Sequence, residues 1–396
     1  MKKFIYVAAL ALVASAACTK VETETQQVKV TFQAANYVPQ TKAGEVSVFN
    51  DFKAFNSRAF LHAEGVDLDA SGNVTSSYQE FFGASGETIS PYNSGNTIIA
   101  NPTASSTDVA YWAPSHEYYW PKGSKSFVNF VGWYGTDGTD AITPAVSYTY
   151  EGSTWTAKMD WTFSNATVGE SGANFLYADM AWRYNENPAA QYKLNGLASD
   201  YKGVPMLFHH ALAQITVKAY VKNADTYPTI NSGVTDGVAT WTVKLTDVEL
   251  TPVNKAGKLA LTNADPGSTQ TQAWTGTWAG TDTAGDLTVS GEKAVTAVAK
   301  TDANDILAAT GVVPQTIGAD VVLNFNLDIT TAYSGSTSHH EILPISVKLN
   351  DMGTTAWEMN KKYTYYLQIN PSQRTVRFDP AVEKDWEVVE TTEKTI

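Results

Sequence analysis

Short runs in which apolar and polar residues alternate recur along the whole chain. Residues 28–32 (VKVTF) place Val28, Val30 and Phe32 on one face of an extended segment, and residues 215–221 repeat the pattern. Alternation with a period of two predicts strands that are buried on one face. No amphipathic run is long enough to predict a helix. Because turns containing Gly and Pro separate these short strands, the pattern predicts an all-β protein.

Predicted strands are spread over most of the chain. Residues 83–110 are rich in Gly, Ser, Thr, Asn and Pro, and there we predict long loops with at most a short strand at residues 97–100. The other predicted strands are residues 28–32, 46–49, 52–61, 78–82, 126–134, 154–163, 174–182, 215–221, 239–250, 258–261, 272–278, 294–298, 306–313, 321–329, 342–349, 361–369, 375–378 and 386–389.

The length of the chain and one change of composition predict two domains. Once a leader of 17 residues is removed, about 380 residues remain, which is more than one hydrophobic core usually holds. A polar stretch at residues 185–203 is followed by a new hydrophobic block, VPMLFHHALAQITVKAYV, that starts at Val204. We place the boundary there and predict one β-sandwich at residues 28–203 and a second at residues 204–396.

The first 18 residues (MKKFIYVAALALVASAAC) have the layout of an export signal. Two lysines precede an apolar run at residues 4–13, and small residues follow it. The apolar run is too short to span a bilayer stably. We therefore predict a signal peptide at residues 1–17.

The small residues directly before Cys18 resemble a bacterial lipobox, in which the cysteine is lipidated and becomes the new N-terminus. Ser15 stands where Leu is usual, and the alternative is an ordinary signal peptide with an incidental cysteine. Two or three acyl chains on Cys18 would anchor the chain stably in a membrane. Residues 18–27 have almost no apolar content and predict a tether between the lipid and the folded body.

Composition excludes several classes of protein. Apolar residues make up 43% of the chain, so the chain can form globular cores, and the net charge of −13 gives no attraction to nucleic acid or anionic lipid. Cys18 is the only cysteine. No intramolecular disulfide can therefore form, and stability must come from packing.

The motifs that usually carry chemistry are not found. The sequence contains no phosphate-binding glycine loop, no HExxH and no nucleophile elbow. Adjacent histidines at 209–210 and 339–340 would point to opposite faces of a strand, so neither pair chelates a metal by itself. Residues 67–72 (DLDASG) resemble the start of a calcium-binding loop, but Tyr78 occupies the twelfth position, where such a loop has a bidentate Glu. We predict no catalytic residue, no metal site and no cofactor, although paired carboxylates of a glycosidase would leave no sequence signal.

Aromatic residues gather at residues 111–134 and include Trp112 and Trp120. Such side chains could stack on sugar rings, or they could fill the space between two sheets. We favour packing in a core.

Several short pieces of sequence occur in the order seen in one known family. They are VKVTF, the TKA step at residues 41–43, YWP at 119–121 followed by FVNF at 127–130, FLYAD at 175–179, FHHALAQI at 208–215, VPQ at 313–315, WEMNKKYTYYLQI at 357–369 and FDPAVEKDW at 378–386. In this order the chain resembles the fimbrillin-like family of Bacteroidetes, the subunits of type V pili. One departure is Asn360, which stands where the family more often has Gly.

The resemblance implies a fold and a way of assembly. The family has two tandem transthyretin-like β-sandwich domains and reaches the outer membrane and cell surface as a lipoprotein. An Arg- or Lys-specific protease then removes the lipidated segment with the first strand, which opens a groove for an extended terminal strand of a neighbouring subunit. The expected partners are therefore other pilus subunits, the outer membrane before processing, and a host surface or glycan.

The resemblance assigns candidate residues to each step. Val28, Val30 and Phe32 would form the removable strand. Lys42 lies in a non-periodic stretch between Pro39 and Gly44 and is our first choice for cleavage, with Arg58 second. The candidate donor strand lies in the C-terminal tail, for which the alternative is a disordered end; its apolar residues are Trp386, Val388, Val389 and Ile396.

Three functions remain open at this point. The leading hypothesis is a structural or accessory pilus subunit without catalytic activity, at a stalk, tip or anchor position. The second is a surface glycan-binding lipoprotein, in which Trp112 or Trp120 would contact the sugar. The third is a secreted hydrolase, for which no motif argues.

Overall fold

The computed structural model describes residues 28–36, 47–48, 54–63, 69–71, 75, 77–93, 109–121, 126–137, 140–141, 143–163, 174–185, 203–222, 240–280, 284–332 and 337–385. These residues form β-strands and two short 3-10 helices, η1 (Lys300–Asp302) and η2 (Leu349–Met352), which confirms the all-β prediction. Within them, no helix has the length and apolar content that a membrane span requires.

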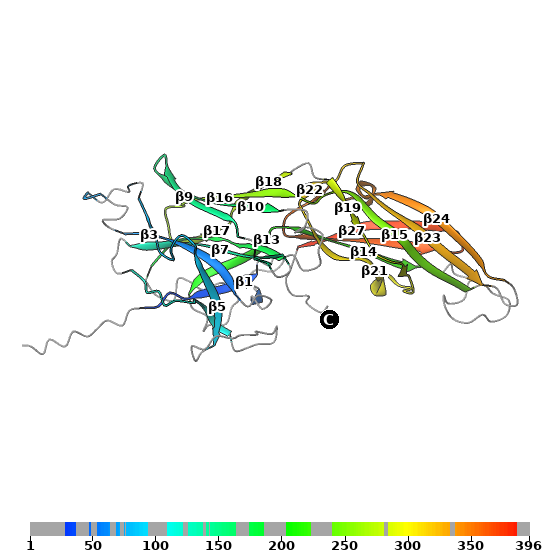
Figure 1. Ribbon diagram of the computed structural model, residues 1–396, viewed down its shortest axis with the longest axis horizontal. Coiled ribbons are helices and arrows are strands. Elements are labelled where there is room, and N and C mark those ends of the chain that lie inside the picture. Colours follow the sequence, from blue (N-terminus) through cyan, green and yellow to red (C-terminus); the bar gives the residue numbers. More distant parts are fainter. Residues whose placement is uncertain are drawn as a thin grey trace, which may run out of the picture.

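The molecule is elongated, with the strands of the first half of the chain at one end and most strands of the second half at the other (Figure 1). The strands are β1 (Phe32–Asn36), β2 (Ser47–Val48), β3 (Phe55–His62), β4 (Gln79–Glu80), β5 (Glu87–Asn93), β6 (Val109–Pro114), β7 (Phe127–Asp137), β8 (Asp140–Ala141), β9 (Ala145–Glu151), β10 (Thr154–Phe163), β11 (Asn174–Ala178), β12 (Met180–Tyr184), β13 (Val204–His210), β14 (Ala213–Val221), β15 (Thr240–Asn254), β16 (Gly257–Ala264), β17 (Gln270–Gln272), β18 (Thr275–Gly280), β19 (Ala284–Thr288), β20 (Lys293–Ala294), β21 (Asn304–Val312), β22 (Gln315–Thr316), β23 (Val322–Ala332), β24 (His339–Lys348), β25 (Ala356–Trp357), β26 (Lys361–Asn370) and β27 (Thr375–Asp385).

Hydrogen-bonded strands close into a ring in the first part of the chain. The order β7-β11-β13-β1-β6-β5-β3 returns to its start because β3 also pairs with β7. We call this circuit the strand ring. Each of its strands contributes to one apolar cluster, with side chains such as Phe32, Phe55, Trp112, Phe130 and Met206. The strand ring therefore encloses a core to which β1 belongs.

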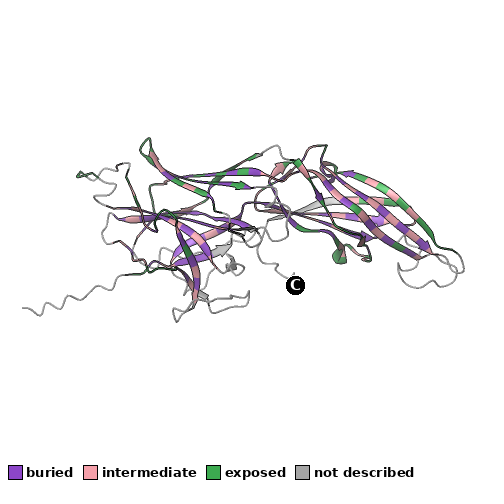
Figure 2. Cartoon of the chain, viewed as in Figure 1, coloured by how far each residue is buried: buried purple, intermediate pink, exposed green. Residues whose placement is uncertain are grey.

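A four-stranded sheet, β18-β16-β10-β9, packs against strands of the ring and against β12. A second cluster fills the space between them and includes Phe60, Trp155, Trp161, Phe175 and Trp182. At the other end of the molecule, the sheets β21-β14-β26-β27 and β19-β15-β23-β24 enclose a third cluster. Buried and less buried residues alternate along their strands (Figure 2), as the period-two pattern predicts.

Strand pairings cross the predicted domain boundary at residue 203. β13 begins at Val204 but pairs with β1 and β11, while β16 pairs with β10 and β17 pairs with β12. Residues 204–210 and 257–280 thus share sheets with the first part of the chain. The division into residues 28–203 and 204–396, and the transthyretin-like layout, stay predictions.

Some strands differ from the prediction. β5 lies in the region predicted as loops; its residues 87, 89 and 91 are buried, but Glu87 and Pro91 hide the alternation because neither is typical of a strand interior. β9 was not predicted either, and the predicted strand at residues 174–182 divides into β11 and β12. The strands predicted at residues 97–100 and 386–389 lie outside the described residues.

The backbone conformation of residue 360 explains why Asn can stand where the family more often has Gly. Its φ of 61° lies in the left-handed region, which Asn tolerates better than most residues. Its side-chain oxygen also accepts a hydrogen bond of 3.1 Å from the backbone N–H of His210. The turn before β26 therefore needs a residue such as Gly or Asn, and here Asn also ties it to β13.

Candidate strand-exchange site

The segment predicted to be removable is buried in the strand ring. Val30 is 2% exposed, and Phe32 and Ala34 are fully buried, whereas Val28 is 48% exposed. Alternate side chains of residues 30–34 therefore point into the core. Of the three predicted residues, Val30 and Phe32 anchor the segment, and Val28 lies at its exposed end.

Phe32 occupies a pocket made of aromatic rings. Its ring centroid lies 5.3 Å from that of Phe130 and 5.9 Å from that of Phe55, both in edge-on geometry, and 6.3 Å from that of Phe82. Edge-on aromatic pairs add to the free energy gained by burying their area. The pocket is therefore a specific seat for an aromatic side chain.

Both edges of the segment are hydrogen bonded. On one side β1 runs parallel to β13, from Phe32 opposite Val204 onward. On the other side, the Val30 N–H donates to the Tyr118 carbonyl at 2.9 Å, the Trp120 N–H donates to the Val28 carbonyl at 3.0 Å, and β6 and β2 pair with β1. Removing the segment would leave unpaired backbone groups on both walls of the space that it fills.

Gly203 fits the backbone of the segment closely. Its φ is +138°, and a Cβ placed on it would lie 2.5 Å from the Thr31 carbonyl oxygen. The next residue, Val204, donates its N–H to that oxygen at 2.8 Å, and the buried Gln33 amide donates to the Gly203 carbonyl at 3.3 Å. Only glycine allows this close approach.

A buried carboxylate supports the wall opposite β13. Glu87 accepts hydrogen bonds from Ser115, from His116 Nδ1 at 3.1 Å and from the Tyr118 hydroxyl at 3.2 Å. Burial raises the pKa of the Glu87 carboxyl. Together, these hydrogen bonds lower the pKa by more than burial raises it, so the pKa lies below the ordinary value of 4.5. Ser115 donates to the carboxylate rather than to an imidazole, so this cluster lacks the hydrogen bond that activates a serine nucleophile.

The second candidate for cleavage, Arg58, lies inside β3. Its Nη1 donates to the Val146 carbonyl at 2.6 Å, its Nη2 pairs with Glu80, and its guanidinium carbon lies 5.3 Å from the centroid of the Phe60 ring. The side chain is 16% exposed. In the folded chain Arg58 is thus held by several contacts, and its cleavage stays a prediction. Lys42, Cys18 and the predicted donor residues Trp386, Val388, Val389 and Ile396 lie outside the described residues.

Comparison with known proteins decides the family. The model of a family described as fimbrillin-like matches residues 82–386, which is well over half of the chain. The chain belongs to the fimbrillin-like family. The resemblance drawn from the order of short motifs is confirmed.

A comparison with solved structures finds several that are similar to this fimbrillin-like chain. A fimbrial protein from Bacteroides vulgatus has 13% identity and a TM-score of 0.49 over 91% of this chain and 99% of its own. Candidate cell adhesion proteins from Bacteroides uniformis (13%, TM-score 0.38, covering 91% and 98%) and Bacteroides ovatus (14%, TM-score 0.38, covering 92% and 99%) are also similar. A search of curated proteins finds no match.

Family membership supports a role as a fimbrial or adhesion subunit at the cell surface, assembled with other pilus subunits. It also suggests a structural rather than an enzymatic protein. The groups that hold a strand in place at this site, apolar side chains and backbone hydrogen bonds, are those that a strand-exchanging subunit needs.

The other candidates from the sequence lie apart from this site or inside its core. Trp112 is 1% exposed and Trp120 is 7% exposed, which confirms core packing and leaves neither ring free to stack on a sugar.

The adjacent histidines of β13 differ in their surroundings. Burial lowers the pKa of His210 well below its ordinary value, with a smaller effect from Lys362. His209 Nε2 lies 2.8 Å from Asp179 Oδ1, so the imidazole of His209 faces a carboxylate, whereas that of His210 does not share this partner.

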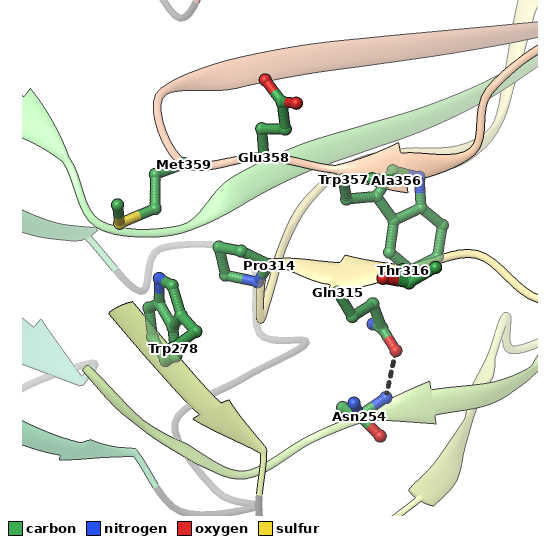
Figure 3. A pocket seen from close by; sticks show the side chains of 9 residues that line it. All are labelled: Asn254, Trp278, Pro314, Gln315, Thr316, Ala356, Trp357, Glu358 and Met359. Carbon is green, nitrogen blue, oxygen red and sulfur yellow. Dashed lines mark hydrogen bonds between the residues drawn. The ribbon is translucent and has the colours of Figure 1, made fainter. Parts of the chain in front are cut away.

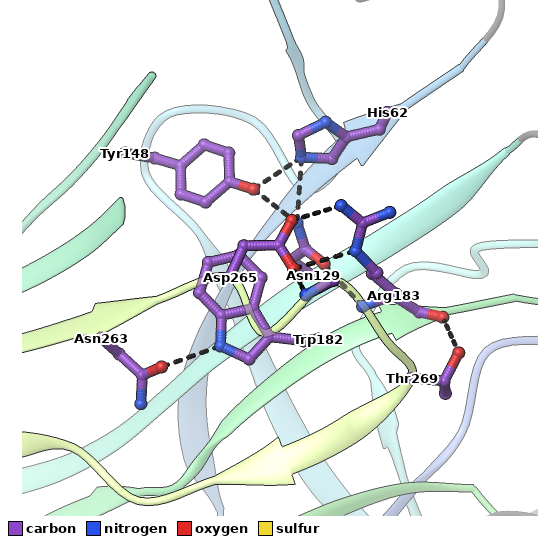
Figure 4. Close-up of polar contacts among 9 residues, drawn as sticks. His62, Asn129, Tyr148, Trp182, Arg183, Asn263, Asp265 and Thr269 are labelled. Atoms are coloured by element: carbon purple, nitrogen blue, oxygen red, sulfur yellow. Dashed lines mark hydrogen bonds and ion pairs between the residues drawn. The ribbon is translucent and has the colours of Figure 1, made fainter. Parts of the chain in front are cut away.

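A polar network that no sequence motif indicates joins residues of the four-stranded sheet to β7 and β12 (Figure 4). His62 Nε2 lies 2.7 Å from the Tyr148 hydroxyl and 2.9 Å from Asn129 Nδ2, and the Asn129 oxygen accepts from the Arg183 N–H at 2.7 Å. Arg183 in turn forms a two-pronged ion pair with Asp265. These residues come from distant parts of the chain, so no local motif could reveal them. They tie the segment after β16 to β12 and the strand ring.

Proposed function

We propose that this chain is a fimbrial subunit that polymerises by strand exchange. In the proposed mechanism, proteolysis removes residues 28–36 together with everything before them. An extended strand of a second copy then fills the space between β13 and β6. Because that contact joins different surfaces of the two copies, its repetition gives an open filament.

The position of β1 in the strand ring is the observation that carries the proposal. Loss of a strand from a closed ring exposes backbone donors and acceptors on both neighbours, beside an apolar pocket. An incoming strand can satisfy the backbone groups and place alternate side chains in the pocket, which is the chemistry of β-augmentation. A free edge of an ordinary sheet would offer only one such row of groups.

The sequence of β27, the last described strand, supports a donor strand supplied by a second copy of this chain. Residues 30–32 read VTF and residues 376–378 read VRF, so both strands carry Val and Phe on one face, two residues apart. The position equivalent to the buried Ala34 is Pro380. β27 also pairs only with β26 among the described residues. Its sequence therefore suits the pocket that Phe32 occupies. The predicted donor residues Trp386, Val388, Val389 and Ile396 follow directly and would lengthen such a strand.

Export and processing complete the proposal. Lipidation at Cys18 would deliver the chain to the outer membrane, and residues 18–27 would hold it off the surface. Cleavage after Lys42, or after Arg58 as the second choice, would then release the first strand. The subunit acts by polymerisation and adhesion and catalyses no reaction.

The test replaces residues 40–44 by the recognition site of a sequence-specific protease, in a chain that starts at Val28. We expect SDS-resistant ladders and filaments in electron micrographs after cutting, and monomers before. A control chain keeps residues 40–44 and receives the same protease. Complete cutting with release of residues 28–36 but no multimers would contradict the proposal.

The natural cleavage site has a separate test. Mass spectrometry of the protein recovered from the cell surface should give an N-terminus at Ala43, or at Ala59 if Arg58 is the site. A chain that still begins at acylated Cys18 would contradict processing and indicate an anchor subunit.

A further inference from the structure

A hollow of about 580 Å³ lies between the edge strand β18 and the two-stranded sheet β22-β25 (Figure 3). Trp278 of β18 lies on one side, Pro314 and Gln315 lie across from it, and Asn254 and Met359 complete its walls. Its volume falls in the range of pockets that hold small ligands, about 300–1,000 Å³. The strands that line the hollow belong to other sheets than β1.

Trp278 is held in place as a partly exposed aromatic platform. Its ring packs on the buried ring of Phe163, with centroids 5.0 Å apart and planes at 36°. Gly257 leaves room for it, because a Cβ at that position would lie 3.3 Å from two of the indole carbons. The indole therefore needs no large rearrangement to receive a ligand against its open side.

The polar groups of the hollow are neutral and also fixed. The Gln315 side-chain oxygen accepts a hydrogen bond of 3.1 Å from the Asn254 backbone N–H (Figure 3), and its amide nitrogen lies 3.3 Å from the Val313 carbonyl. Thr316 adds a hydroxyl. The one charged residue of the lining, Glu358, points away from the hollow in Figure 3. Among the described residues that line the hollow, no charged side chain is directed at a ligand.

We propose that this hollow binds a neutral saccharide. A pyranose ring offers an apolar C–H face to an aromatic platform and hydroxyl groups to neighbouring amides and hydroxyls, and this hollow presents both kinds of group. A purely apolar ligand would bury the Thr316 hydroxyl and the second N–H of the Gln315 amide without offering either a hydrogen bond. The site is independent of strand exchange, so it would serve adhesion in either a monomer or a filament.

Saturation-transfer difference NMR tests the proposal on the chain that starts at Val28. The probes are maltose, lactose, mannobiose and chitobiose. We expect saturation transfer to at least one probe, a loss of affinity of about tenfold in Trp278→Ala, and a smaller loss in Trp278→Phe, which keeps a stacking ring. Thr277→Ala is the matched control, because Thr277 is exposed on the same strand with its side chain on the opposite face.

Unfolding curves of each variant show whether the fold is kept, and Trp278→Phe remains informative if Trp278→Ala unfolds. Two results would overturn the proposal. The first is no transfer to any of the four sugars at millimolar concentration. The second is equal affinity in the parent chain and the folded Trp278 variants.

Discussion

The first and last described strands share a sequence pattern but differ in their surroundings. In β1, Phe32 is fully buried, and neighbours are hydrogen bonded along both edges. In β27, Val376 and Phe378 are only partly buried against the second-half core, and β26 is the single partner among the described residues. The same pattern therefore occupies a deep site at one end of the molecule and a sheet edge at the other.

This difference would give the proposed strand exchange a direction. Burial of apolar area and closed aromatic contacts stabilise a Phe side chain more in the pocket of β1 than at the edge of β27. In the proposed exchange, a Phe side chain that moves from the edge into the pocket would gain aromatic contacts and burial. The intact chain cannot make this move because its own β1 fills the pocket, so proteolysis would control the timing of assembly.

The largest expected effect comes from truncating the two phenylalanines. Phe32→Ala should lower the free energy of unfolding by about 3–5 kcal/mol, because it leaves a cavity among buried rings, and Phe378→Ala by about 1–2 kcal/mol. Urea unfolding of the uncut chain measures both. Equal losses would remove the contrast between the deep and the shallow site.

A smaller effect should follow from Gly203→Ala, since the added Cβ would collide with the Thr31 carbonyl. We expect a loss of about 2–3 kcal/mol and faster hydrogen exchange at the Val30 amide, which bonds to Tyr118. The control is Gly291→Ala, at a φ of +72° with nothing near the added carbon, which should cost about 1 kcal/mol. If the two variants behave alike, the close approach to β1 contributes nothing.

Glu87 should make the wall of the pocket sensitive to acid. Its pKa in the folded chain lies below 4.5, so its contribution to stability is complete above that pH and is lost as the pH falls through the folded value. Glu87→Gln should cost about 1 kcal/mol at pH 7 and flatten the loss of stability below pH 4.5. Urea unfolding at a series of pH values measures this, and parallel curves for both chains would refute it.

The smallest effect should come from the exposed ion pair of Lys29 with Glu117. Pairs in water contribute little, so Lys29→Ala should leave the unfolding midpoint unchanged within error. A clear shift would mean that charge, rather than apolar contact and backbone pairing, holds the first strand.

Local patterns in the sequence predict the all-β class, many strands and the burial of Val30 and Phe32, whereas Val28, predicted on the same face, is 48% exposed. Alternation is a local property, so it survives whatever the strands later pack against. The position of β1 between β13 and β6 could not be predicted, because Phe32 pairs with Val204 and Trp112, and pairing between segments so far apart in the chain leaves no local trace. β5 was missed because Glu87 and Pro91 occupy inward positions.

The candidate site was predicted in part. Val30 and Phe32 stand out by alternation, whereas the role of Gly203 depends on the backbone of a distant strand. The rings around Phe32 come from three separate segments of the chain. The sequence alone favoured the core for Trp112 and Trp120 because aromatic residues often fill the space between two sheets, but it did not exclude contact with a sugar. Trp278 had no distinguishing neighbours in sequence, since Phe163 and Gln315 reach it only through the fold.

A disulfide test addresses the central claim most directly. Gln33 is paired with Pro205, and Asp379 holds the position of Gln33 in the matching pattern of β27. One copy carries Asp379→Cys and the other Pro205→Cys, in chains that start at Val28 and so lack any other cysteine. We predict a disulfide-linked pair after both copies are cut between β1 and β2, and not before, while an off-register His209→Cys partner links poorly. A mixture that is fully cut and oxidised yet yields no 379–205 link would contradict strand exchange by β27.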